Sequence, residues 1–256
     1  MPFLDRREAG RRLVERVRGF HTADTVVLGV PRGGVPVAYE VAAALGAPLD
    51  VAVVRKLRVP YQPELVFGAL GEDGVRVVDD KILVRAFVSD SGRAQVETDE
   101  RAELARTALR LRGGAERLDL HGRTVVIVDD GVATGATARA ALATARARGA
   151  LRTVLAVPVG SVRSIRALAA VADHVVCLET PEMFHSIGHW YRDFPPGEPA
   201  GGGGVVARAG AGGRRWGAGF RAPRGPRPFS SPRRITNTPG STPTTPPSPG
   251  TRWSTR

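Results

Sequence analysis

The chain has 256 residues, of which 42% are hydrophobic, enough for one folded domain with a substantial core. Its single cysteine, Cys177, excludes a disulfide framework and a cysteine-based metal site within one chain, and favours a reducing, cytoplasmic setting. The net charge of +12 suggests an acidic partner, but ten arginines and one acid lie in 197–256, so this segment carries +9 of it. Residues 1–196 therefore carry an ordinary charge of +3.

Membrane insertion is disfavoured by the distribution of apolar residues. The first residues contain no apolar signal core, and no stretch approaches the roughly 20 apolar residues that are needed to span a bilayer. We therefore expect no membrane partner.

Residues 1–196 show the alternation of helix and strand patterns that is typical of α/β proteins. Apolar positions at Leu13, Val14 and Val17 give 5–20 the spacing of an amphipathic helix. Short apolar, β-branched runs predict buried strands at 25–30, 50–54, 75–78, 124–128, 153–157 and 174–178. Stretches rich in alanine, leucine and arginine predict helices at 35–45, 89–111, 136–148 and 161–171. This order predicts a mostly parallel twisted sheet flanked by helices.

Two segments break the pattern. Residues 58–74 contain Pro60, Pro63 and several glycines, and we expect an irregular stretch whose length suits a mobile lid. From 197 to 256, glycine, proline, serine, threonine and arginine dominate, which predicts a disordered basic C-terminal tail after a folded domain at 1–196. The tail could make a weak nucleic-acid contact, could be merely solvated, or could result from a reading-frame shift.

The most informative segment is Val125-Val-Ile-Val-Asp129-Asp130-Gly-Val-Ala-Thr-Gly-Ala-Thr137. It combines a strand, an acidic pair, a small-residue turn and a helix start. Free backbone N–H groups in the turn and at the helix N-terminus suit a phosphate, and Gly135 permits close approach. Carboxylates are good acceptors for vicinal ribose hydroxyls. Simple helix capping by the two acids is the alternative.

This segment resembles the 5-phosphoribosyl-1-pyrophosphate (PRPP) signature of the type I phosphoribosyltransferases. The resemblance extends to uncharacterised bacterial members that carry Pro-Arg-Gly-Gly, Arg-Lys-Leu and Trp-Tyr-Xaa-Asp-Phe. It implies the type I phosphoribosyltransferase fold with a small hood. It also implies that Asp129 and Asp130 bind the ribose hydroxyls, and that the 5′-phosphate is bound by Ala133, Thr134, Gly135, Ala136 and Thr137. The hypoxanthine-guanine branch has an aspartate where Ala133 stands, so the acceptor remains undecided.

Two further segments fit the resemblance. In Pro31-Arg32-Gly33-Gly34 the glycines free the backbone and Arg32 can offer a fork of donors to diphosphate. This segment resembles the family's pyrophosphate loop, in which the peptide is often cis. Arg55 and Lys56 follow a predicted strand at its carboxyl end, where ligands bind in open α/β sheets. We expect Arg32, Arg55 and Lys56 to supply catalytic positive charge, and the alternative for Arg55-Lys56 is a solvated charge pair.

Residues 180–194 are rich in aromatic side chains and histidines, which could stack on and hydrogen-bond a nucleobase. Phe184 resembles the aromatic residue on which the purine branch stacks its base, which places Phe184 on the acceptor side. For Trp190 and Phe194 we favour a role in closing the edge of the core. His185 and His189 lack a third ligand at convincing spacing, so we expect no zinc site.

The resemblance implies an enzyme that transfers the 5-phosphoribosyl group from PRPP to a nitrogen acceptor and releases pyrophosphate. We expect this acceptor to be a nucleobase. Mg²⁺ would be held through PRPP, bridging diphosphate and ribose oxygens, with no direct protein ligand. The alternative is a non-catalytic regulator that senses PRPP or a nucleotide with the same cradle. The sequence does not separate these functions, and it leaves a homodimer open.

Overall fold

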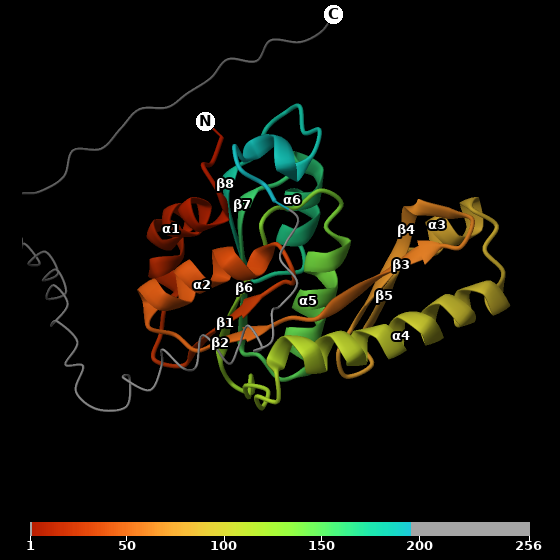
Figure 1. The fold of residues 1–256 in the computed structure, drawn as a ribbon, viewed down its shortest axis with the longest axis horizontal. Coiled ribbons are helices and arrows are strands. Elements are labelled where there is room, and N and C mark those ends of the chain that lie inside the picture. Colours follow the sequence, from red (N-terminus) through yellow and green to blue (C-terminus); the bar gives the residue numbers. More distant parts are fainter. Residues whose placement is uncertain (1, 196–256) are drawn as a thin grey trace, which may run out of the picture. The chain divides into compact units, whose positions relative to one another are not determined.

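The computed structural model describes residues 2–195, and these residues fall within one compact unit (Figure 1). Five parallel strands form the main sheet in the order β2-β1-β6-β7-β8. Their bounds are β1 (Thr25–Gly29), β2 (Leu49–Val51), β6 (Thr124–Val128), β7 (Arg152–Val159) and β8 (His174–Glu179). The predicted α/β class and mostly parallel sheet are confirmed.

Strand β6 lies at the centre of this sheet because all five of its residues are apolar or β-branched and are buried. Successive side chains point to opposite faces, as the twofold repeat of a strand requires. Val126 and Val128 pack on one face of the sheet, whereas Val125 and Ile127 pack on the other. A strand that is buried on both faces fixes the position of whatever follows its carboxyl end, and here that is the acidic pair.

Helices cover both faces of the sheet. On one face lie α1 (Arg6–Val17) and α2 (Gly34–Leu45), which bury Leu13, Val17 and Val41 against β6 and β7. On the other face lie α5 (Ala136–Ala147) and α6 (Val162–Ala169), which bury Leu142 and Leu168. A 3₁₀ turn, η1 (Arg18–Phe20), extends α1. These helices match their predicted ranges closely, because the spacing of apolar residues selects one buried face on each helix.

A second, antiparallel sheet lies beside the main one and contains β3 (Val54–Val59), β4 (Gln62–Gly71) and β5 (Arg76–Val78). The expectation of an irregular stretch at 58–74 is therefore wrong. Leu57, Val59 and Phe67 are fully buried in their own apolar cluster, and this burial outweighs the local effect of the prolines and glycines. Gly68 fits this sheet because an added Cβ would meet the carbonyl oxygen of Val77 on β5.

The remaining strand predictions need two corrections. The stretch 50–54 was expected as one strand, but it divides between β2 of the main sheet and β3 of the second sheet. The strand at 75–78 exists but belongs to the antiparallel sheet. Helix α3 (Asp80–Arg85), which the sequence did not predict, packs on that sheet. Apolar runs as short as these do not specify which sheet they join.

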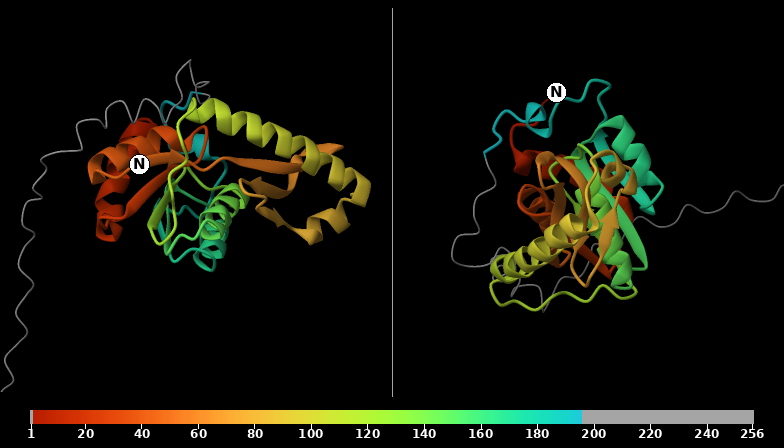
Figure 2. Two further views of the ribbon diagram at one scale, coloured as in Figure 1. Left: turned by 90° about the horizontal axis from the view of Figure 1, so that it is seen from below. Right: turned by 90° about the vertical axis from the view of Figure 1, so that its right-hand side faces the viewer.

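Helix α4 (Asp90–Arg112) is mostly polar, and only its last two residues are buried. Arg112 ties its end to the rest of the molecule: Nε lies 3.0 Å from Asp50 Oδ1, and Nη1 lies 2.7 Å from Glu72 Oε1. Figure 2 shows α4 running along the second sheet, to one side of the parallel sheet. The helix therefore joins both sheets through this buried ion-pair network and through partly buried apolar residues, Val96 and Leu104, that pack against the second sheet.

The C-terminal part of the described chain forms the predicted small hood. It contains the 3₁₀ turn η2 (Ile187–Trp190), and Phe3 pairs with Tyr191 in an isolated parallel bridge. No helix within residues 2–195 is long and apolar enough to cross a membrane. The boundary predicted at 196 and the predicted tail, 197–256, lie outside the described residues.

Candidate ligand pocket at the carboxyl ends of the parallel strands

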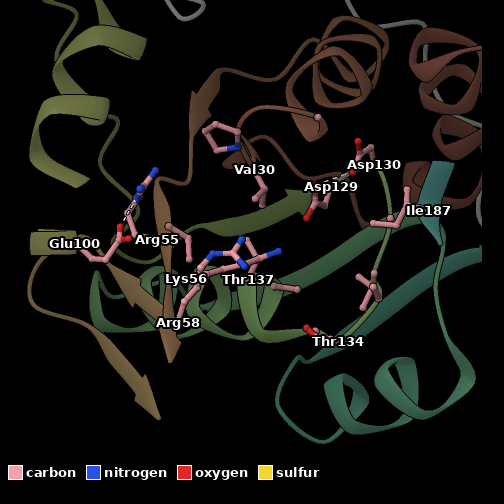
Figure 3. Close-up of a pocket in the computed structure, with 18 residues that line it drawn as sticks. Val30, Arg55, Lys56, Arg58, Glu100, Asp129, Asp130, Thr134, Thr137 and Ile187 are labelled. Carbon is pink, nitrogen blue, oxygen red and sulfur yellow. Dashed lines mark hydrogen bonds and ion pairs between the residues drawn. The ribbon is translucent and has the colours of Figure 1, made fainter. Parts of the chain in front are cut away.

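A pocket of about 350 Å³ opens at the carboxyl ends of β1 and β6 (Figure 3). Five parts of the chain line it: the loop after β1, strand β3, helix α4 through Glu100, the segment from β6 into α5, and η2 through Ile187. Figure 3 shows it extending from Ile187 of η2 to the pair formed by Arg55 and Glu100. Of the predicted site residues, the structure places Gly33, Arg55, Lys56, Asp129, Asp130, Ala133, Thr134, Gly135 and Thr137 around this pocket.

The acidic pair follows β6 directly. Asp129 Oδ1 accepts a hydrogen bond from the backbone N–H of Asp130 at 2.9 Å, which fixes the first carboxylate against its own chain. Asp130 is 7% exposed, and its Oδ2 accepts a hydrogen bond from Arg6 Nε at 2.9 Å. The two carboxylates are therefore held differently, the first by backbone and the second by a buried guanidinium.

Burial dominates the electrostatics of both acids. Desolvation, reinforced by the negative charge of Asp130, raises the pKa of Asp129 well above its ordinary value. Desolvation also raises the pKa of Asp130, although the hydrogen bond and positive charge of Arg6 oppose this. An acidic pair in this state gains most from a ligand that donates hydrogen bonds to it or brings positive charge.

The turn after the acids leads into α5. Gly135 caps the helix with φ of +80°, a left-handed conformation that favours glycine, and α5 starts at Ala136. The carbonyl oxygen of Ala133 accepts hydrogen bonds from Ser161 Oγ at 2.9 Å and Ser164 Oγ at 2.7 Å. Two serines at the start of α6 thus hold this turn in place, and the first N–H groups of α5 remain free of helix partners.

The loop after β1 lies against the acidic pair. The peptide bond between Pro31 and Arg32 is cis. An added Cβ at Gly33 would collide with the Asp130 carboxylate, and one at Gly34 would lie 2.7 Å from the Asp129 Cα. Both glycines are therefore required by close approach to the acids. Neither the buried Gly34 nor the exposed Arg32 lines the pocket.

Strand β3 brings three cationic side chains to the pocket: Arg55, Lys56 and Arg58. Arg55 Nε lies 2.6 Å from Glu100 Oε2 on α4, so part of its charge is already balanced. Lys56 lies close enough to lower the pKa of Asp129 slightly against the effect of burial. The second sheet thus delivers positive charge to the edge of the parallel sheet.

The aromatic hood residues lie at one side. Trp190 and Phe194 pack against a cluster of Phe3, Val159 and Tyr191, as expected for the edge of the core. Phe184 packs on the same cluster and lines a second cavity, with Arg163 and Arg166, rather than the pocket. Ile187 is the hood residue that reaches the pocket.

Comparison with known proteins decides the family. A model of the phosphoribosyl transferase domain matches residues 6–190. The chain belongs to this family. The resemblance seen in the sequence is thereby confirmed, and the match covers the parallel sheet, the antiparallel sheet and the hood as far as Trp190.

Relatives of this phosphoribosyltransferase domain occur in bacteria. Proteins from two strains of Mycobacterium tuberculosis, both named "Putative phosphoribosyl transferase", are 54% identical over 192 residues, which is 75% of this chain and 43% of theirs. The chain thus spans less than half the length of these relatives. A crystal structure of a Thermus thermophilus protein is similar with 40% identity and a TM-score of 0.69, covering 81% of this chain and 99% of that one.

Five contributors to the candidate site of this phosphoribosyltransferase domain were not predicted from the sequence: Arg6, Arg58, Glu100, Ile187 and Tyr191. Arg6 is one of several arginines on α1, and Glu100 is one of several acids on α4, so composition does not single out either residue. The Trp-Tyr-Xaa-Asp-Phe motif was a usable signal for Tyr191, whose hydroxyl donates to the backbone oxygen of Asp130 at 2.6 Å. Nothing in the sequence marked Ile187.

Proposed function

We propose that the pocket binds PRPP and that the protein transfers its 5-phosphoribosyl group to a nitrogen acceptor, releasing pyrophosphate. One observation carries this proposal: two carboxylates and a helix-start turn lie in one pocket, opposite a row of cationic side chains on β3. Such an arrangement offers separate partners to the hydroxyls, the phosphate and the diphosphate of a single ligand. Membership of the phosphoribosyltransferase family supports the same ligand.

We assign ribose binding to Asp129 and Asp130, whose carboxylate oxygens would accept hydrogen bonds from the vicinal hydroxyls. The 5′-phosphate would lie on the turn formed by Ala133, Thr134, Gly135, Ala136 and Thr137. There the free N–H groups of the first turn of α5 and the threonine hydroxyls donate to it. Together these contacts would orient the sugar so that its C1 atom faces the acceptor.

The leaving diphosphate would be stabilised by Arg55 and Lys56 and by the loop containing Arg32, Gly33 and Gly34. In the transfer step the bond between C1 and the diphosphate oxygen breaks and a bond from C1 to the acceptor nitrogen forms. The electron pair leaves with pyrophosphate, and the acceptor releases its N–H proton to solvent. Positive charge around the diphosphate stabilises the oxocarbenium-like transition state between these events.

We propose that Mg²⁺ arrives at this site together with PRPP. Within residues 2–195, no group of three His, Cys, Asp or Glu side chains is placed to hold a metal by itself. When bound through PRPP oxygens, Mg²⁺ would supply additional positive charge to the diphosphate. The residues of the chain would still do the orienting, because the carboxylates and the phosphate turn contact the sugar directly.

For the acceptor we propose a nucleobase-like heterocycle that enters from the hood side, where Ile187 closes the pocket. Phe184 is three residues away in the same hood segment and would take part if this segment closes over the ligand. Alanine at position 133 provides no acid or base for a purine ring, so base specificity must come from other residues.

The experiment is a titration of the full chain with PRPP in the presence of Mg²⁺, followed by a screen of nucleobases for pyrophosphate release. We expect calorimetric binding of PRPP and release of pyrophosphate with one class of heterocycle. Binding without release from any acceptor would favour the sensing function instead. If the folded protein does not bind PRPP at all, transfer from PRPP and sensing of PRPP are both wrong.

A further inference from the structure

The second acid of the pair is held by residues from the two ends of the described chain. Arg6 lies in the first turn of α1, 124 residues before Asp130, and its Nε donates to Asp130 Oδ2 at 2.9 Å. The two side chains are about nine-tenths buried, at 10% and 11% exposure. An ion pair this buried requires a defined geometry to offset the cost of desolvation.

The hood completes the surroundings of this ion pair. The Tyr191 hydroxyl donates to the backbone oxygen of Asp130 at 2.6 Å, and the Phe194 ring lies 3.9 Å from the guanidinium carbon of Arg6. Arg6 Nη1 also donates to the backbone oxygen of Pro195 at 2.8 Å. Thus Arg6 contacts a carboxylate, an aromatic face and a carbonyl oxygen at once, which immobilises its side chain.

The hood is in turn fastened to the chain segment before α1. The backbone N–H of Phe3 donates to the carbonyl oxygen of Trp190 at 2.7 Å, and the backbone N–H of Arg192 donates to the carbonyl oxygen of Phe3 at 2.8 Å. Phe3 is fully buried beside Tyr191. The start of the chain and the hood therefore form one structural unit around Asp130.

We propose that Arg6, Tyr191 and Phe194, which we call the Asp130 clamp, are positioning residues that fix the Asp130 carboxylate for a ribose hydroxyl and supply its counter-charge. This inference rests on the proposed function, since it assigns the clamp to the same ligand. Arg6 acts through Asp130 and does not line the pocket itself.

The burial of the Asp130 carboxylate explains why a counter-charge is needed. Asp129 faces it from the same segment, Glu8 lies on α1 near Tyr191, and Lys56 acts mainly on Asp129 from β3. Arg6 is therefore the cation that acts directly on Asp130, and removing it would raise the pKa of this carboxyl further. If PRPP binding needs the ionised acid, a variant without Arg6 should lose affinity on acidification at a higher pH than the wild type.

The test compares full-length variants in titrations with PRPP and Mg²⁺ at pH values between about 5 and 9. Arg6→Gln removes the counter-charge, and Arg7→Gln is the matched control because Arg7 is exposed and pairs with Glu40 on the surface. We expect Arg6→Gln to weaken PRPP binding at neutral pH by about tenfold or more. The acid limb of its affinity profile should move to higher pH, while Arg7→Gln retains the wild-type profile.

Two milder variants keep the inference testable if Arg6→Gln does not fold. Arg6→Lys retains the positive charge but loses the planar set of guanidinium donors, and Tyr191→Phe loses only the hydroxyl. Both variants should therefore weaken PRPP binding without moving the acid limb of the affinity profile. The clamp would be overturned if folded Arg6→Gln, or both milder variants, bound PRPP as tightly as Arg7→Gln at every pH.

The titration of the Asp130 carboxyl in the absence of ligand, measured by NMR, separates the clamp from the proposed function. If Arg6→Gln moves this titration but wild-type protein does not bind PRPP, the proposed function fails and the ribose role of the clamp fails with it.

Discussion

At the residue scale, adjacent buried carboxylates are the most demanding feature of this protein. Burial raises the pKa of both Asp129 and Asp130, and the negative charge of Asp130 raises the pKa of Asp129 further. Natural proteins retain such pairs at functional sites more often than elsewhere, because a ligand can satisfy them. The surrounding residues stabilise both carboxylates: a backbone N–H donates to Asp129, a guanidinium donates to Asp130, and glycines next to both leave room for them.

Removing both acids tests their proposed role on the ribose. In a double variant with Asp129→Ala and Asp130→Ala, hydrogen bonds to charged groups worth about 1.5 to 3 kcal/mol each are lost. We expect PRPP affinity, measured by calorimetry, to fall by at least about tenfold. Asp24→Ala is the control, because Asp24 is exposed and remote from the pocket. Unchanged affinity in a folded double variant would refute the assignment.

Gly135 tests the phosphate turn. Its φ of +80° strains any other residue, and a side chain there would also point toward Leu168. Gly135→Val should abolish the thermal stabilisation that PRPP gives the protein, because the turn can no longer donate to the phosphate. Gly114→Val is a matched control, since Gly114 has φ of +86° in open space after α4. If the two variants keep equal PRPP stabilisation, the phosphate binds elsewhere.

At the element scale, α4 influences the pocket through one contact. Glu100 holds Arg55, a proposed diphosphate ligand, at 2.6 Å, so a carboxylate competes with the substrate for this guanidinium. This contact links α4 to strand β3 of the second sheet at the position where the leaving group is expected. The remaining length of α4 presents mostly polar residues to solvent.

The variant Glu100→Gln removes that competition. We expect inorganic pyrophosphate to bind about three- to tenfold more tightly, since a negative charge near the diphosphate disappears. Glu97→Gln is the control on the same helix, because Glu97 pairs with Arg76 outside the pocket. Weaker binding by Glu100→Gln, measured by calorimetry, would mean that Glu100 positions Arg55 instead of competing for it.

The buried network at the end of α4 makes a prediction about stability. Arg112→Met removes the nearest cation from the buried Asp50 and Glu72, so the free energy of unfolding should fall by about 3 to 5 kcal/mol. Arg110→Met should change it little, because Arg110 is exposed and its pair with Glu103 lies on the surface. Urea unfolding monitored by circular dichroism provides the measurement. Equal stability of the two variants would show that the network contributes nothing net.

At the scale of the whole molecule, charge and function separate along the chain. All proposed ligand contacts lie within 2–195, whereas 197–256 carry +9 of the net +12. Pro195, whose carbonyl oxygen accepts from Arg6, also precedes this segment. The two parts of the chain can therefore be tested independently.

Truncation after Pro196 is the corresponding experiment. PRPP affinity and the cooperative melting of the protein should remain as in the full chain, because the proposed pocket and its clamp are retained. Any salt-sensitive association with DNA, followed by fluorescence anisotropy, should disappear with the arginines. A truncated protein that loses PRPP binding would show that 197–256 contribute to the site.

Much of the fold could be predicted because it depends on local patterns. The strand and helix periods around β1, β6, β7 and β8 specify a parallel sheet, and the spacing from Asp129 to Thr137 places an acidic pair directly before a helix start. The antiparallel sheet was missed at 58–74 because its burial comes from α3 and α4, which follow later in the chain. Glycines such as Gly68, which favour loops locally, allow close strand contact there.

The sequence by itself determined the family, the parallel sheet and the chemical groups of the main motif, because these are encoded in contiguous residues. Only the tertiary structure decided which distant residues complete the site. Arg6, Glu100 and Tyr191 reach the pocket residues from α1, α4 and the hood, and their pairing depends on side chains that meet after folding. A buried carboxylate requires a counter-charge, but it does not specify which of the 37 lysines and arginines will provide it.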